Sequence, residues 1–280
     1  MYSTRFAPSP TGPLHLGHAF SALTAFDRAR ADGGRCLLRI EDIDRARARP
    51  AWEAQIYDDL AWLGLRWPKP VLRQSDRAPA YSAALNQLAD QGLLYPCRCR
   101  RTDIEAAAAA PQEGGPQFGP DGRIYPGTCR ARPMSDRQPG DVLRLNLARA
   151  LSGAPELAFE ETGPLYRGHH RLDPDSLIAT IGDPVLERRG MAGSYHLCVV
   201  VDDGAQDITE VVRGADLFEA TVLHVLVQHL LGLPVVRYHH HRLIRDDAGK
   251  RLAKRDDARS LGFYRSQGLT PEDIRAMVGL

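Results

Sequence analysis

Two histidines near the start of the sequence follow a proline-rich turn, in a pattern that suits anion binding. The stretch from Arg5 to His18 reads RFAPSPTGPLHLGH, which is an extended apolar opening, a turn, and then the two histidines. We interpret the residues after the turn as the start of a helix with Thr11 as its N-cap. His15 and His18 then share one helix face and can point at one anion near the helix N-terminus. Gly17 lets a ligand approach the backbone.

Carboxylates and a cation elsewhere in the chain offer further chemistry. Glu41 follows a short apolar strand at 36–40, and acidic residues at the carboxyl end of such a strand lie where ligands bind in α/β sheets. We interpret 196–203, HLCVVVDD, as a buried strand that ends in two aspartates. We expect these aspartates to be structural or hydrogen-bonding residues near a site. The basic run KRLAKR at 250–255 contains Lys254, and such a run alone is typical of a solvated surface.

Three cysteines lie close enough in the sequence to act together. Cys97, Cys99 and Cys129 supply three thiolates, which can bind zinc tetrahedrally if a fourth ligand is present. The spacing alone favours zinc only slightly over three reduced cysteines. His169 and His170 remain open as ligands at this stage.

The pattern of apolar residues predicts the elements that position these groups. We expect helices at 15–32, 50–63, 76–91, 218–231 and 270–278, and strands at 36–40, 142–147, 156–160 and 235–238. The opening order of strand, helix, strand and helix predicts the first half of a nucleotide-binding α/β fold. Thr102-x-x-Glu105 is a capping-box pattern that leads into a run of alanines. Alternate residues of a strand face opposite ways, so we expect His239–His241 to pack locally and bind no metal.

Length and composition limit the alternatives. The chain has 280 residues, which is enough for one large domain or one domain with an insertion. Its formal net charge of +1 excludes a strong overall attraction to nucleic acid, so such contacts would need local basic patches. No apolar run approaches the roughly 20 residues that cross a bilayer, and the start lacks a signal-peptide layout. We therefore expect a cytoplasmic protein, and a monomer.

Two stretches resemble signatures of the class I aminoacyl-tRNA synthetases. The string RFAPSPTGPLHLGH resembles their HIGH signature, in the form typical of the glutamyl and glutaminyl branch. The run Arg251–Arg255 resembles their KMSKS loop, and Lys254 matches its catalytic lysine. Ala253 stands where the family has serine, which removes one hydroxyl donor and retains the cation.

This resemblance implies an α/β fold, namely a Rossmann-type class I catalytic domain with a small inserted zinc-binding subdomain and a short helical C-terminal segment. The implied parts are 1–96, 97–165, 166–245 and 246–280, without an anticodon-binding domain. The implied substrates are L-glutamate and ATP with Mg²⁺. Glu41 would face the α-ammonium group, and Arg5 and Arg213 would hold carboxylates. The implied catalytic residues are His15, His18 and Lys254, the ATP site adds Gly17, and the glutamate site comprises Arg5, Phe6, Ala7, Pro8, Ser9, Glu41, Tyr195 and Arg213.

Within that branch, the chain resembles the stand-alone glutamyl-queuosine tRNA(Asp) synthetases. The resemblance implies transfer of glutamate to queuosine at the wobble position of tRNA(Asp). It also implies one structural zinc held by Cys97, Cys99, Tyr125 and Cys129, with tyrosine as the fourth ligand. Two alternatives remain: a synthetase that charges a tRNA 3′ end, and an inactive paralogue that binds tRNA or an amino acid. Six arginines of the insertion form either a tRNA surface or a solvated face: Arg98, Arg100, Arg101, Arg123, Arg130 and Arg132.

Overall fold

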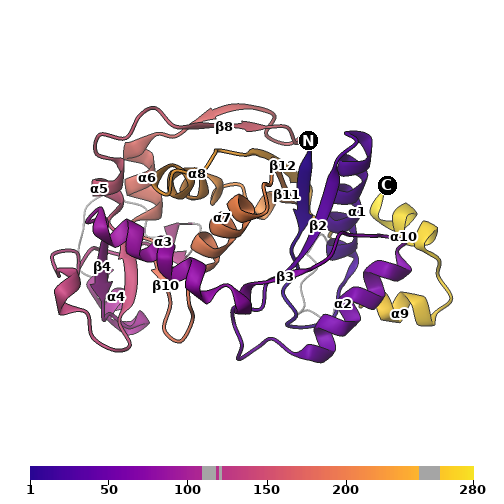
Figure 1. The fold of residues 1–280 in the computed structure, drawn as a ribbon, viewed down its shortest axis with the longest axis horizontal. Helices are drawn as coiled ribbons and strands as arrows, with labels where there is room; N and C mark the ends of the chain where they lie inside the picture. The colour runs from indigo at the N-terminus through magenta and orange to yellow at the C-terminus, as the bar shows by residue number, and fades with distance from the viewer. Residues whose placement is uncertain (109–117, 120–121, 246–258) are drawn as a thin grey trace.

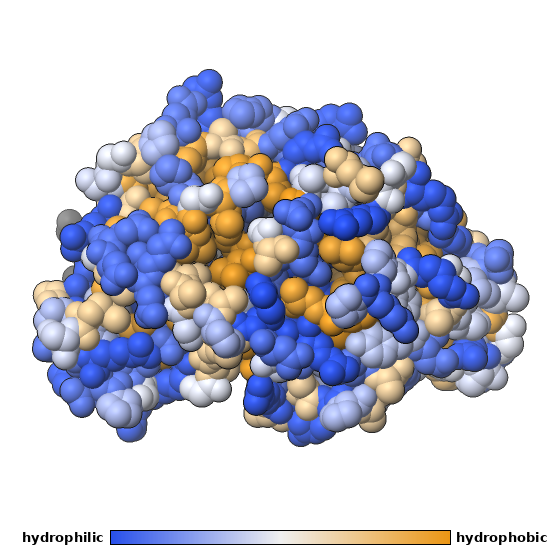
Figure 2. Space-filling view, viewed as in Figure 1, coloured by the Kyte–Doolittle hydropathy of each residue, from blue (hydrophilic) through white to orange (hydrophobic). Residues whose placement is uncertain are grey.

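The computed structural model describes residues 1–108, 118–119, 122–245 and 259–280. The N-terminal strands and helices lie on one side of the molecule together with the C-terminal helices (Figure 1). The elements between about 94 and 187 form most of the opposite side. Helices α7 (Tyr195–Ala205) and α8 (Thr221–Leu230) lie between the two. Hydrophobic residues gather on this face in the middle of the molecule, whereas hydrophilic residues cover most of the rim (Figure 2).

A layer of mainly parallel strands contains the first and the last strands of the described residues. One sheet has the order β1-β2-β3 and another has the order β11-β12-β8-β9. Strand β11 lies alongside β1, because Thr209 N donates to the Ser3 carbonyl oxygen at 2.9 Å and Ser3 N donates to Thr209 Oγ1 at 2.9 Å. The bounds are β1 (Ser3–Phe6), β2 (Arg35–Ile40), β3 (Leu72–Arg73), β8 (Ala158–Glu161), β9 (Gly168–Arg171), β11 (Glu210–Gly214) and β12 (Arg237–His241).

Amphipathic helices pack on this layer. Helices α1 (Leu16–Ala31) and α2 (Pro50–Trp62) bury apolar side chains in one core cluster with β1 and β2, as their spacing predicts. Helix α3 (Ala78–Asp90) contributes Tyr81 and Leu88 to a second core cluster shared with α7 and α8. The C-terminal helices α9 (Leu261–Ser266) and α10 (Pro271–Val278) return to α1, where Arg275 pairs with Asp27 at 2.7 Å.

A smaller antiparallel sheet lies on the other side. Its order is β10-β7-β4, with β4 (Leu94–Cys97), β7 (Val142–Leu145) and β10 (Val185–Glu187). Strand β8, which belongs to the stretch 97–165, pairs instead with β12. The remaining elements are α4 (Arg101–Ala108), β5 (Phe118–Gly119), β6 (Gly122–Arg123), α5 (Leu147–Leu151), α6 (Pro174–Ile181) and the 3₁₀ turns η1 (Gln74–Asp76), η2 (Met134–Asp136) and η3 (Ala215–Leu217).

The segment HLCVVVDD is a helix, so the strand predicted at 196–203 is wrong. Helix α7 begins after Ser194, whose hydroxyl accepts from the backbone N of Leu197 at 3.5 Å. Nearly every residue of α7 up to Asp203 is buried. A segment that is buried all round has no polar face, so its apolar run carries no period that separates helix from strand.

Both predicted N-caps are also wrong. Helix α1 begins at Leu16 with His15 as its N-cap, four residues after Thr11. Helix α4 begins at Arg101, and Asp103 Oδ2 accepts from the backbone N of Arg100 at 2.7 Å. Thr102 therefore lies inside the first turn. In each case a nearby side chain satisfies the free N–H groups, so the local preference of threonine does not decide the start.

The other boundaries differ by a few residues. Strand β12 covers the three histidines that were expected to follow it, and α8 begins three residues after the predicted start. The helix predicted at 76–91 is α3, which begins two residues later and follows the short turn η1. Within the described residues, no helix combines the length and the apolar character needed to span a membrane.

Candidate active site

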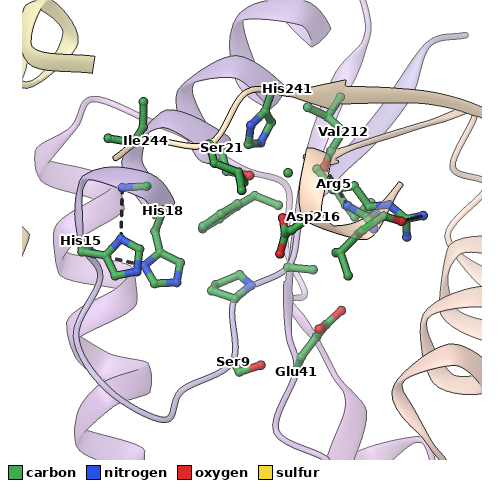
Figure 3. A pocket seen from close by; sticks show the side chains of 18 of the residues that line it. Arg5, Ser9, His15, His18, Ser21, Glu41, Val212, Asp216, His241 and Ile244 are labelled. Atoms are coloured by element: carbon green, nitrogen blue, oxygen red, sulfur yellow. Dashed lines mark hydrogen bonds between the residues drawn. The ribbon is translucent and has the colours of Figure 1, made fainter. Parts of the chain in front are cut away.

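An open cavity of about 530 Å³ lies at the carboxyl ends of β1, β2, β11 and β12 (Figure 3). This is the edge at which open α/β sheets bind ligands. Its lining includes every residue expected for glutamate or ATP that the structure describes, namely Arg5, Phe6, Ala7, Pro8, Ser9, His15, Gly17, His18, Glu41, Tyr195 and Arg213. Lys254 lies outside the described residues.

The two histidines on one side of the cavity are held by a mutual cap at the start of α1. His15 Nδ1 accepts from the backbone N of Gly17 at 3.1 Å, and His18 Nδ1 accepts from the backbone N of His15 at 3.1 Å. The ring centroids lie 3.8 Å apart. Each Nδ1 therefore presents a lone pair, so the proton of each neutral imidazole is on Nε2. The helix start thus fixes both rings as Nε2–H donors.

Gly17 leaves room for this arrangement. A Cβ added at residue 17 would lie 2.9 Å from Cε1 of His15 and 3.1 Å from its Nδ1. A side chain here would push the imidazole away from its capping position. This explains the glycine between the two histidines by a contact that sequence analysis did not foresee.

The side chain of Arg5 enters the cavity on the other side (Figure 3), and an ion pair holds its guanidinium group. Its Nε donates to Asp203 Oδ1 at 2.9 Å and its Nη1 donates to the Val212 carbonyl oxygen at 3.2 Å. Arg39, which is fully buried, shares the same Oδ1 at 2.8 Å. Burial opposes ionisation of Asp203, but the two guanidinium groups hold its pKa below the usual range.

Glu41 lies at the same side of the cavity and is connected to the first signature. Its backbone N donates to the Pro8 carbonyl oxygen at 3.1 Å. The nearest charged partner of its carboxylate is Arg39, with Nη2 at 3.6 Å from Oε1. Desolvation raises the pKa of Glu41 to about 7, because it outweighs the opposing effects of Arg39 and Arg5. The group therefore changes charge near neutral pH.

The two aspartates of α7 act as hydrogen-bonding hubs, as expected. Asp203 joins the two arginines described above, and Asp202 accepts from Tyr81 Oη at 2.8 Å and from Gln74 Nε2 at 3.1 Å. These partners come from α3 and η1. Asp202 and Asp203 therefore fasten α7 to the elements around the cavity.

The described residues on either side of the segment that contains Lys254 lie at the cavity and beside His15. Ile244 lines the cavity just before the undescribed residues 246–258. Just after them, Ser260 forms an antiparallel bridge with His15, and Leu261 N donates to the Leu14 carbonyl oxygen at 2.8 Å.

Three cysteines and a tyrosine converge at the end of β4. The sulfur atoms of Cys97, Cys99 and Cys129 all lie within 4.8 Å of one another. Tyr125 Oη lies 3.4 Å from Cys97 Sγ and 3.5 Å from Cys99 Sγ, and the sulfurs of Cys99 and Cys129 are 3.6 Å apart. All five cysteines are free thiols.

These separations match a tetrahedral metal site. Zn–S bonds of about 2.3 Å and a Zn–O bond of about 2.0 Å imply S···S of about 3.8 Å and O···S of about 3.5 Å. Among the described residues, the cysteine cluster is the group with such geometry, and His169 and His170 are not part of it. Instead, Nε2 of His170 contacts the Tyr166 carbonyl oxygen at 2.6 Å.

Several cavity residues were not expected from the sequence. Asp216 lies between the histidines and Arg5 (Figure 3), and Arg242 follows the end of β12. Arg39, which lies behind the cavity between Asp203 and Glu41, was also missed. The sequence feature that could have identified these residues is their position within or just after strands that end at the cavity.

Comparisons with known proteins show what the chain is similar to. Residues 1–152 and 155–280 match the family described as tRNA synthetases class I (E and Q), catalytic domain. The chain is 62% identical over 280 residues to a glutamyl-Q tRNA(Asp) synthetase of Rhodobacter capsulatus, covering 99% of each protein. It is 40% identical over 276 residues to a protein of the same name from Rhodopirellula baltica, covering 96% of this chain and 82% of that one.

The fold is similar to a crystal structure of a glutamate tRNA ligase from Elizabethkingia meningosepticum in complex with its amino acid. The TM-score is 0.76 at 25% identity. The alignment covers all of this chain but spans only 60% of the ligase chain.

Proposed function

The chain belongs to the class I tRNA synthetases of the glutamate and glutamine (E and Q) branch, and from this we propose that it activates L-glutamate with ATP and transfers it to a tRNA. One observation carries the proposal: a single cavity is lined by two imidazole donors on one side and by Arg5, Glu41 and Arg213 around the remainder. A nucleoside triphosphate needs the imidazole donors for its phosphate oxygens. A dicarboxylic amino acid needs the two arginines for its carboxylates and the glutamate for its ammonium group.

The chemistry is a phosphoryl substitution. The α-carboxylate of glutamate attacks the α-phosphorus of ATP, and pyrophosphate leaves with Mg²⁺. Negative charge on the phosphate oxygens is stabilised by preorganised donors, and the Nε2–H groups of His15 and His18 have the required type. The N-terminus of α1 adds its partial positive charge.

Lys254 supplies the cation expected from the resemblance. Its support comes from the described residues on either side, since Ile244 lines the cavity and Ser260 bridges to His15. A stretch of fifteen residues, 245 to 259, separates these two positions. An ammonium in that stretch would neutralise the triphosphate opposite the imidazoles.

The glutamate site follows from charge complementarity. Glu41 accepts the α-ammonium group, and Arg5 and Arg213 bind carboxylates. Phe6, Ala7, Pro8 and Ser9 line the same cavity, together with Tyr195 from the start of α7.

We propose that the acceptor is queuosine at the wobble position of tRNA(Asp), because the relatives matched over 99% and 82% of their own length are named glutamyl-Q tRNA(Asp) synthetases. A hydroxyl of its diol attacks the mixed anhydride and AMP leaves. We propose that the reaction takes place in the cytoplasm, where modified tRNA and ATP are found.

Four of the six arginines predicted for a tRNA surface fall into two groups, whereas Arg101 pairs with Glu105 at 2.9 Å and Arg123 lies over the ring of Phe118. Arg130 and Arg132 pair with Asp183 and Asp141 at 2.7 and 3.0 Å, which gives both a structural role. Arg98 and Arg100 form no ion pair with any other residue that the structure describes, and both are exposed. We propose the latter as contacts for an anticodon loop, whose splayed bases and phosphates suit arginine.

We propose that the cysteine cluster holds one structural zinc through Cys97, Cys99, Tyr125 and Cys129. The donor separations described above support this, together with the absence of disulfides at these cysteines. A closed tetrahedral site of this kind would connect the end of β4 to the turn at Cys129 and stabilise the small sheet.

The proposed function is tested by supplying labelled glutamate and ATP with three tRNAs. We expect pyrophosphate exchange without tRNA, and labelling of tRNA(Asp) with queuosine but not of tRNA(Asp) without it. Nuclease digestion should leave the label on the anticodon-loop fragment. Labelling of tRNA(Glu) at its 3′-terminal adenosine would instead identify a charging synthetase, and no exchange would identify a binding protein.

Glutamate binding should weaken as the pH falls through 7. The anionic form of Glu41 binds the ammonium group, and its pKa of about 7 means that this form is lost below neutrality. We expect kcat/KM for glutamate to fall roughly tenfold per pH unit between about 6.5 and 5.5, as expected for one proton. Pyrophosphate-exchange kinetics from pH 5.5 to 8 measure this fall in kcat/KM, which is the acid limb of the pH profile.

The variant Glu41→Gln provides the control. It should have a raised KM at pH 8 and no acid limb, since its side chain does not titrate. If the acid limb persists unchanged in Glu41→Gln, another group is responsible and the assignment of Glu41 is wrong.

A further inference from the structure

Two buried histidines hold the guanidinium group of Arg213. Its Nε donates to Nε2 of His240 at 3.0 Å and its Nη1 contacts Nδ1 of His224 at 2.9 Å. Its Nη2 donates to Thr221 Oγ1 at 2.8 Å and to the Leu217 carbonyl oxygen at 3.2 Å. These contacts use four of the five guanidinium N–H groups. Arg213 nevertheless lines the cavity, and among the described residues the second N–H of Nη1 has no acceptor, so it can bind a ligand.

Contact with Arg213 fixes the protonation of both imidazoles. A guanidinium is always protonated and only donates, so His240 Nε2 and His224 Nδ1 must present lone pairs. The proton of His240 then lies on Nδ1, which faces Glu161 Oε2 at 2.5 Å. The proton of His224 lies on Nε2, which faces Nδ1 of His196 at 3.0 Å.

Glu161 is itself held firmly. Its Oε1 accepts from the backbone N of Gly163 at 2.6 Å and from the backbone N of His240 at 2.9 Å. A Cβ at residue 163 would lie 2.4 Å from the His240 carbonyl oxygen, so only glycine allows this turn. Despite burial, the contacts from His240 and Gly163 keep the pKa of Glu161 below its usual value. The carboxylate therefore fixes the orientation of the His240 ring.

Arg5 and Arg213, the two cavity arginines proposed to bind carboxylates, differ in what touches them. Arg5 is paired with the carboxylate of Asp203, which offsets much of its charge. The direct hydrogen-bond partners of Arg213 among the described residues are imidazoles, a hydroxyl and a carbonyl, which orient the guanidinium without cancelling its charge. Burial lowers the pKa of both His224 and His240, which keeps them neutral.

We propose that His224 and His240 are positioning residues that orient Arg213 and reserve its charge for a carboxylate of the substrate, which sets the preference for glutamate over its amide, glutamine. This inference rests on the proposed function, because it takes glutamate as the substrate. The proposal requires that the side chains in contact with Arg213 are neutral. Any anionic side chain in direct contact with Arg213 would compete with the ligand.

An isosteric pair of variants tests the charge of this support. His224→Asn puts an amide oxygen near the position of Nδ1 and keeps a neutral acceptor, whereas His224→Asp has the same shape and adds a negative charge. We expect His224→Asn to keep KM for glutamate within about threefold of the wild type, and His224→Asp to raise it at least about tenfold with little change in kcat. The ratio of kcat/KM for glutamate to that for glutamine should fall by a similar factor in His224→Asp. Equal KM values in the two variants, or an unchanged ratio, would overturn the proposal.

His239→Gln is the matched control. His239 is a buried histidine of the same strand, but its Nδ1 contacts Thr162 Oγ1 at 3.1 Å and it does not touch Arg213. We expect its KM to equal that of the wild type. A rise as large as that of His224→Asp would mean that any disturbance of buried histidines acts on the site, which counts against a specific role.

A second measurement uses the unaltered protein and no substrate. Nitrogen chemical shifts of the histidine rings should identify His224 as the neutral Nε2–H tautomer and His240 as the neutral Nδ1–H tautomer at pH 7. An imidazolium or the opposite tautomer at either position would overturn the inference. Absence of glutamate-dependent pyrophosphate exchange in the wild type would count against the proposed function instead, so the two failures are distinguishable.

Discussion

Replacing His15 by asparagine is expected to preserve stability and to lower glutamate-dependent pyrophosphate exchange by about 10²–10³-fold. The imidazole has two separable roles. Its Nδ1 caps α1 by accepting from Gly17 N, and asparagine is among the best residues for that task. Its Nε2–H is the donor that we assign to a phosphate oxygen, and asparagine at the cap cannot reproduce it. Initial rates and the thermal midpoint measure the two roles.

His15→Ala is the companion variant, because it removes both roles. It should lose the same activity and, in addition, about 1 kcal/mol of stability through the missing cap. If His15→Asn retained wild-type exchange, His15 would be a capping residue only and the assignment of the anion site would fail.

Removing the metal from the cysteine cluster is expected to unfold the region around it. Structural zinc contributes on the order of 10 kcal/mol to small domains that depend on it, and the core cluster here consists mainly of Tyr95, Cys97, Tyr125 and Cys129. We expect the purified protein to contain one zinc per chain. Chelation, or the variant Cys129→Ala, should lower the thermal midpoint and open the chain to proteolysis near Cys129.

Two variants sharpen this test. Cys36→Ala removes a buried cysteine of β2 outside the cluster and should keep one zinc. Tyr125→Phe should keep three thiolate ligands but weaken metal binding, and it should alter the visible spectrum of the cobalt-substituted protein. A wild-type protein without metal, or one unaffected by chelation, would contradict the assignment.

Much of the site could be predicted from short stretches of sequence. The family match and the fold confirm the α/β class I catalytic domain. Arg5 to His18 form one end of a strand, a turn and a helix start, so their chemistry is contiguous and visible in the sequence. The cysteine cluster could be predicted for a similar reason, because Cys97 and Cys99 are only two positions apart and Cys129 follows thirty positions later.

The features that were missed depend on contacts between residues, some of them far apart in the sequence. His240 meets Glu161 across 79 residues, through the pairing of β12 with β8, and no local pattern encodes that register. Helix α7 was assigned as a strand because its burial on all sides is a property of the packing around it. The cap at His15 was missed because it depends on the partner His18, whereas propensities describe one residue at a time.

The contact between β1 and β11 has a consequence for synthesis of the chain. Ser3 and Thr209 are separated by 206 residues, so the strand that carries Arg5 leaves the ribosome long before its neighbour exists. At about 5–20 residues per second, the delay is roughly 10–40 seconds. Throughout that interval one edge of the nascent sheet stays uncovered, and the cavity is completed only after β11 and β12 have been synthesised.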